Sequence, residues 1–113
     1  MSPRSWLIRV NDMIKAINDS ISIISGKTFS DFQKDRTLVL ASLACVQIIG
    51  EASKHIPDEV KLKYPQIPWN EIRGMRNRVT HEYFEVDESI LWETLKSDFP
   101  DLKAELEKIV QDR

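Results

Sequence analysis

Apolar side chains recur at intervals of three and four residues along most of this chain, which restricts the fold to helices. The first periodic stretch follows Ser2-Pro3, a pair suited to a helix cap and first turn, and ends at Gly26. A second begins near Ser30 or Asp31 and stops before Pro57. The expected inward positions are Trp6, Val10, Met13, Ile14, Ile17, Ile21 and Ile24, then Leu38, Val39, Ser42, Cys45, Val46, Ile49 and Ala52.

Prolines divide the second half of the chain into shorter helices. A loop over 57–68 holds one helical turn around 58–63, and a third helix covers about 69–84. Asp87 suits the cap of a fourth helix, which Pro100 either kinks or follows with a short fifth. The expected inward positions here are Ile90, Leu91, Leu95 and Phe99, then Leu102, Leu106, Ile109 and Val110. The pattern predicts an all-α bundle of four to five helices.

The composition predicts a single domain over residues 1–113 in a reducing cytoplasm. With 42% apolar residues the chain can bury a core without disulfides or a structural metal. Cys45 is the only cysteine and lies in an apolar run, so we expect a buried thiol. One cysteine and two histidines exclude a thiolate zinc site, and we expect neither metal nor cofactor. No apolar run approaches the ~20 residues of a membrane span, and the first helix is too charged for a signal peptide.

A cluster of chemically active residues lies in the stretch 76–83, which reads Arg-Asn-Arg-Val-Thr-His-Glu-Tyr. An arginine can grip a phosphate with two parallel hydrogen bonds, and a histidine exchanges protons near neutral pH. The net charge of −2 gives no general attraction to nucleic acid, so binding would rest on a basic patch of Arg73, Arg76 and Arg78. A solvated helix face explains these three arginines equally well.

Helical geometry separates the two residues best suited to catalysis. At about 100° per residue, Arg76 and Tyr83 fall on nearly the same face, whereas His81 lies about 140° from Arg76. Either the helix ends or distorts near His81, or a two-fold axis brings in the same segment of a second subunit. We favour the homodimer, which also doubles the local positive charge. Gly50 and its small neighbours let another helix approach closely, and Glu51 either points into a cleft or is an ordinary exposed residue.

The motif Arg76-x4-His81-x-Tyr83, with polar Asn77 after the arginine, resembles the signature of HEPN domains of the HepT toxin type. The segments 49–52 (Ile-Gly-Glu-Ala) and 68–69 (Pro-Trp) resemble the same family. The resemblance implies a homodimeric helical bundle with a metal-independent ribonuclease site in the interface cleft. It also implies a partner, a small MNT-type nucleotidyltransferase antitoxin, which in this family can silence the toxin by attaching AMP to the motif tyrosine.

Each residue of the motif has a chemical role beside this resemblance. His81 would deprotonate the ribose 2′-hydroxyl or protonate the leaving 5′-oxygen, and Arg76 would neutralise charge on the phosphate. Asn77 would orient the phosphate or the imidazole, while Arg73 and Arg78 would bind the flanking RNA backbone. The sequence leaves open a helix-terminal histidine satisfied by carbonyls and a tyrosine that closes the helix against the core.

Three functions are compatible with these residues. The leading hypothesis is a cytoplasmic ribonuclease toxin of a type II toxin–antitoxin pair, with Tyr83 as the AMP acceptor. The second is a non-catalytic subunit that holds a nucleotide or an RNA end for a nucleotidyltransferase. The third is a purely structural dimeric subunit.

Overall fold

The computed structural model describes residues 3–112 and confirms the all-α class, since the regular structure of that range is entirely helical. The long helices are α1 (Pro3–Ile24), α3 (Arg36–Lys54), α5 (Trp69–Glu82) and α7 (Phe99–Asp112). The short ones are α2 (Phe29–Lys34), α4 (Asp58–Lys63), α6 (Glu88–Glu93), a 3₁₀ turn η1 (Tyr83–Glu85) and a π-helical turn η2 (Thr94–Asp98). The expected cap at Ser2 lies outside the described residues.

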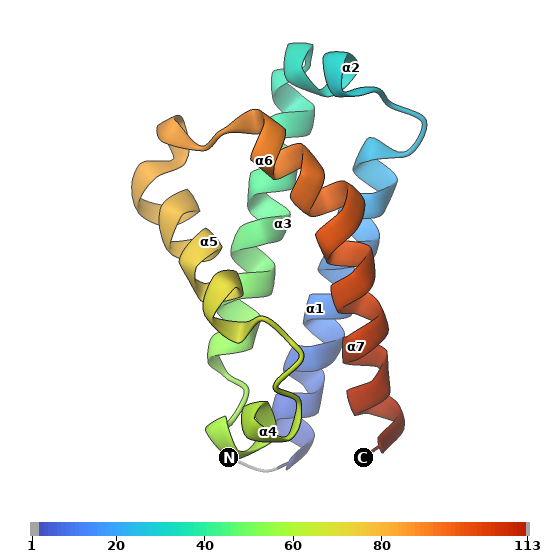
Figure 1. The fold of residues 1–113 in the computed structure, drawn as a ribbon, viewed down its shortest axis with the longest axis vertical. Helices are drawn as coiled ribbons and strands as arrows, with labels where there is room; N and C mark the ends of the chain where they lie inside the picture. The colour runs from blue at the N-terminus through green and yellow to red at the C-terminus, as the bar shows by residue number, and fades with distance from the viewer. Residues whose placement is uncertain (1–2, 113) are drawn as a thin grey trace.

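The core lies where α1 packs against both α3 and α7, while α5 packs on the other side of α3 (Figure 1). Most side chains predicted to face inward are buried, including Met13, Ile49 and Leu106. Ile90 is an error of the prediction, because its side chain is 52% exposed. Leu91 is buried as predicted, whereas Trp92, which was not among the predicted positions, is buried in place of Ile90 because a single helical face cannot accommodate all three.

The predicted second helix is in fact two helices, which separate at Asp35. Thr28 and Asp31 form a capping box for α2. The Thr28 N–H donates to the Asp31 carboxylate, and the Asp31 N–H donates to the Thr28 hydroxyl oxygen. The Asp35 carboxylate accepts hydrogen bonds from the N–H groups of Thr37 and Leu38 and so starts α3. The apolar spacing continues through this break, so periodicity alone did not reveal it.

Pro100 is the second residue of α7, which starts at Phe99, so the fifth helix begins within one residue of the predicted position and the chain bends just before it. The Asp87 carboxylate caps α6 as predicted, accepting from the N–H groups of Ser89 and Ile90. Pro100 has no N–H, and the preceding turn widens so that the Phe99 N–H donates to the Thr94 carbonyl, five residues back. The π turn joins α6 and α7 into one bent rod (Figure 1).

Within the described part of the chain one helix, α3, is long and apolar enough to cross a membrane by length and composition alone. This helix is the one on which α1, α2 and α5 all pack. An apolar sequence is therefore needed at this position to build the core, with Val46 and Ile49 as its buried side chains.

Candidate functional site

The motif helix α5 is held to α3 by a very close approach at Gly50. Ile72 and Val79 are the buried side chains of α5, and they fix which face meets α3. A Cβ added to Gly50 would lie 2.2 Å from the Cβ of Arg76 and 2.4 Å from its Cγ. The small residue Gly50 therefore allows the close approach of a neighbouring helix, as predicted, and the residue of that helix in contact with it is the motif arginine, Arg76.

Arg76 is fixed by two partners along the seam between α3 and α5. Its side chain is only 17% exposed, and its Nη2 pairs with the Glu51 carboxylate. Its Nη1 donates to the Asn77 Oδ1 at 2.9 Å. The buried Nε donates to no described residue. The Lys54 ammonium lies 3.9 Å from the same Glu51 oxygen, so this carboxylate joins two cations.

His81 and Tyr83 differ from Arg76 in being open to solvent. His81 is exposed in the last turn of α5 and makes no hydrogen bond or ion pair with the described part of the chain, so carbonyls do not satisfy it. Tyr83 is 56% exposed in η1, with its ring edge-to-face on Phe84 at 5.7 Å. His81 thus lacks the carbonyl partners, and Tyr83 the burial against the core, that the sequence left open as alternatives.

The exposed face of α5 carries a polar row formed by Arg73, Asn77 and His81 at intervals of four residues. Arg73 donates to Asn70 at 3.3 Å within the same helix. The backbone leaves helical geometry at Glu82 (φ −140°, ψ 37°), so α5 ends directly after His81, as one of the two predicted alternatives required. Even so, the described residues show no contact that joins His81 to Arg76. Within one subunit, the hydrogen bond from Arg76 to Asn77 is the contact among the described residues that links Arg76 to this row.

Arg78 does not share the face of Arg76, because residues two apart on a helix point about 200° apart. It is exposed, and among the described residues it forms no ion pair. The basic patch expected from the sequence is consequently spread around α5 rather than gathered at one point.

An exposed apolar strip lies on α3 beside this site. We call the strip formed by Leu40, Ala44 and Ile48 the α3 outer face, whose two large side chains are 46% and 48% exposed. Gln47, on the adjoining side of α3, accepts a hydrogen bond from the Thr80 hydroxyl of α5 at 2.8 Å. A small cavity of about 170 Å³ near Tyr83 adjoins the strip at Leu40.

Sequence comparison identifies the family of the chain. A family model described as "Ribonuclease HepT-like" matches residues 13–109. The chain belongs to the HepT-like family. This HepT-like chain is 42% identical over 110 residues to a protein of Caldanaerobacter subterraneus subsp. tengcongensis named "Putative RNase", covering 97% of this chain and 96% of the relative. It is 41% identical over 102 residues to "Probable ribonuclease HepT" of Thermococcus cleftensis, covering 87% and 93%. No solved structure matched the chain.

In this HepT-like protein Glu51 is the site residue that sequence reasoning left undecided. Its carboxylate lies against the Arg76 guanidinium, although 25 residues separate the two in sequence. The only signal in the sequence was its position directly after the glycine that contacts α5. As for metals, the described residues contain no group of three or more histidine, cysteine or carboxylate side chains placed to hold an ion.

Proposed function

We propose that this HepT-like protein is a cytoplasmic endoribonuclease toxin that cleaves RNA without a metal, at a site shared by two subunits. One observation carries this proposal: Arg76 is held rigidly by Glu51 and Asn77, whereas His81 lies free on the neighbouring exposed row. A fixed cation and a free imidazole are what phosphodiester cleavage needs. The family membership and the names of the relatives support the same activity.

The proposed reaction uses the ribose of the substrate as its own nucleophile. His81 of one subunit takes the proton of the 2′-hydroxyl, whose oxygen then bonds to phosphorus as the bond from phosphorus to the 5′-oxygen breaks. The second copy of His81 protonates the leaving 5′-oxygen. Arg76 neutralises charge on the phosphoryl oxygens, with Asn77 orienting the phosphate and Arg73 and Arg78 binding flanking backbone. A 2′-hydroxyl nucleophile restricts the substrate to RNA.

The dimer in this proposal forms through the α3 outer face. Leu40 and Ile48 each expose nearly half of their surface, and the strip lies next to the seam that holds Arg76. A two-fold axis along this strip would bring the α5 helices of two subunits together across the cleft. Burial of the strip would supply the apolar contact that such an interface needs.

Tyr83 gives this site a means of control by a nucleotidyltransferase antitoxin of the MNT type. Its exposed phenol is a nucleophile for the α-phosphate of ATP, and the transfer would form a tyrosyl phosphodiester and release pyrophosphate. The added AMP would place negative charge and bulk beside Arg76. RNA would then be repelled from the cleft, and the toxin silenced.

Cleavage assays with matched variants test the catalytic proposal. We expect Arg76→Ala and His81→Ala each to lower the RNA cleavage rate at least a hundredfold, since both groups act in the transition state. His55→Ala, at the exposed C-cap of α3, and Arg9→Ala, on α1, are the controls and should leave the rate unchanged. A mixed dimer of one wild-type and one His81→Ala subunit should also cleave RNA much more slowly, because the proposed reaction uses both copies of His81.

The alternative is a subunit that binds RNA or a nucleotide without cleaving it. The exposed row of Arg73, Asn77 and His81 is compatible with this second function, because donors on an open helix face can bind phosphate without cleaving it. Purified wild-type protein that binds RNA tightly, leaves it intact and does not inhibit growth would establish this alternative and refute catalysis.

A further inference from the structure

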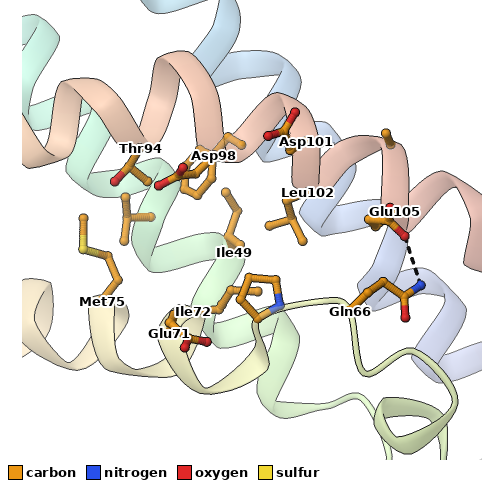
Figure 2. Close-up of a pocket in the computed structure, with 14 residues that line it drawn as sticks. Ile49, Gln66, Glu71, Ile72, Met75, Thr94, Asp98, Asp101, Leu102 and Glu105 are labelled. Carbon is orange, nitrogen blue, oxygen red and sulfur yellow. Dashed lines mark hydrogen bonds between the residues drawn. The ribbon is translucent and has the colours of Figure 1, made fainter.

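A second hollow lies between α5 and α7, with α3 as its base (Figure 2). Its volume is about 820 Å³ and its floor is apolar, formed by Ile49, Ile72, Phe99 and Leu102. We call this hollow the α5–α7 groove. Neither Arg76 nor His81 lines it.

The rim of the α5–α7 groove is acidic on both sides. Glu71 comes from α5, while Asp98, Asp101 and Glu105 come from the π turn and α7 (Figure 2). Glu105 is bonded to Gln66 and to Lys108, at 3.0 and 3.1 Å, and these bonds lower the pKa of its carboxyl. The other three carboxylates are exposed and have no hydrogen bond or ion pair within residues 5–112.

Two further features distinguish the groove from an ordinary gap between helices. Met75 stands half-buried at its edge, and methionine is the side chain that adapts most readily to different apolar partners. The π turn supplies Thr94 and Asp98 to the lining, and such turns are frequent at functional sites. An apolar floor with an adaptable edge suits the apolar side chains of a protein segment.

The charge and length of the groove select one kind of occupant. RNA would be repelled by the three unpaired carboxylates. The lining takes residues 71–75 from α5 and residues 99–105 from α7, so the groove accommodates about two turns of a helix. An amphipathic helix would place apolar side chains on the floor and lysine or arginine side chains against both rims.

We propose that the α5–α7 groove is a docking site for a basic amphipathic helix of a protein partner. Glu71 and Met75 lie on the side of α5 opposite the row of Arg73, Asn77 and His81, so a docked helix leaves the RNA-facing residues open. The docking proposal does not depend on the proposed catalysis, and a separate binding measurement tests it.

A labelled model peptide tests the docking proposal on the whole protein. The probe has about 14 residues, so that two of its turns can lie in the groove, with leucines at intervals of three and four and flanking lysines. Fluorescence anisotropy compares wild type with the variant Glu71→Gln/Asp98→Asn/Asp101→Asn. The control variant is Asp19→Asn/Glu59→Gln/Glu107→Gln, which removes the same charge at exposed positions outside the groove. Ala104→Arg, at an exposed groove position, tests occlusion independently.

We expect the peptide to bind wild type and the control variant equally, and to bind the groove variant and Ala104→Arg at least tenfold more weakly. A peptide with glutamates in place of the lysines should not bind. Two results would overturn the proposal: no binding to wild type, or equal loss in the control variant. A change of the groove variant from dimer to monomer would also overturn it, since a second copy would then be the occupant.

Discussion

Gly50→Ala should destabilise the protein although alanine is the better helix residue. A β-carbon at this position would lie 2.2 Å from the Arg76 Cβ, whereas carbon atoms in contact normally lie about 3.5–4.0 Å apart. The two helices would have to separate by roughly 1.5 Å, by comparison of these distances. The Arg76 Cβ is tied to its backbone, so a side-chain rotation cannot relieve the contact.

The expected cost follows from two opposing effects. Overpacking at a rigid contact lowers the free energy of unfolding by up to about 3 kcal/mol. Replacing a helical glycine by alanine raises it by about 1 kcal/mol, because alanine has the higher helix propensity. The free energy of unfolding should therefore fall by about 2 kcal/mol, which for a domain of this size lowers the melting temperature by roughly 8 °C.

Gly74→Ala is the matched control on the facing helix. A β-carbon at Gly74 has no atom within 4 Å, so the same substitution should raise the free energy of unfolding by up to about 1 kcal/mol. Urea denaturation followed by circular dichroism measures both variants. If Gly50→Ala were as stable as wild type while Gly74→Ala gained stability, the close approach of α5 and α3 would be refuted.

Two further predictions concern titratable groups. Burial raises the pKa of the Cys45 thiol, with the Asp19 charge adding to the effect, so a disulfide reagent at pH 8 should modify Cys45 far more slowly in native than in urea-unfolded protein. Bonds from Ser89 and Ile90 lower the pKa of Asp87, so its contribution to stability is present above its unfolded pKa of about 3.9 and is lost as the pH falls through the lower folded value. Asp87→Asn should therefore weaken the acid-side pH dependence of urea unfolding, and an unchanged dependence would contradict this role for the cap.

The sequence predicted the helical class and most of the core because both depend on local spacing. It missed the break at Asp35, since no proline or glycine interrupts the apolar pattern there and the helix start depends on a single capping carboxylate. It also placed Ile90 inward, because three consecutive apolar residues do not show which of them faces the core.

The candidate site was predictable in its residues but not in its contacts. The spacing of Arg76 and His81 correctly placed them on different faces of a regular helix. The pairing of Arg76 with Glu51 depends on how α5 packs on α3, and no local pattern contains that information. The α5–α7 groove was missed for the same reason, because its lining comes from three helices distant in sequence.

The shallow burial of α5 has a consequence for how the molecule opens. Only Ile72 and Val79 of this helix belong to the buried core, whereas α1, α3 and α7 contribute most of its side chains. Local unfolding needs less free energy where few apolar side chains are buried. Local opening of α5 should therefore cost less free energy than unfolding of the whole bundle, and amide hydrogen exchange should be faster in α5 than in α1, α3 and α7.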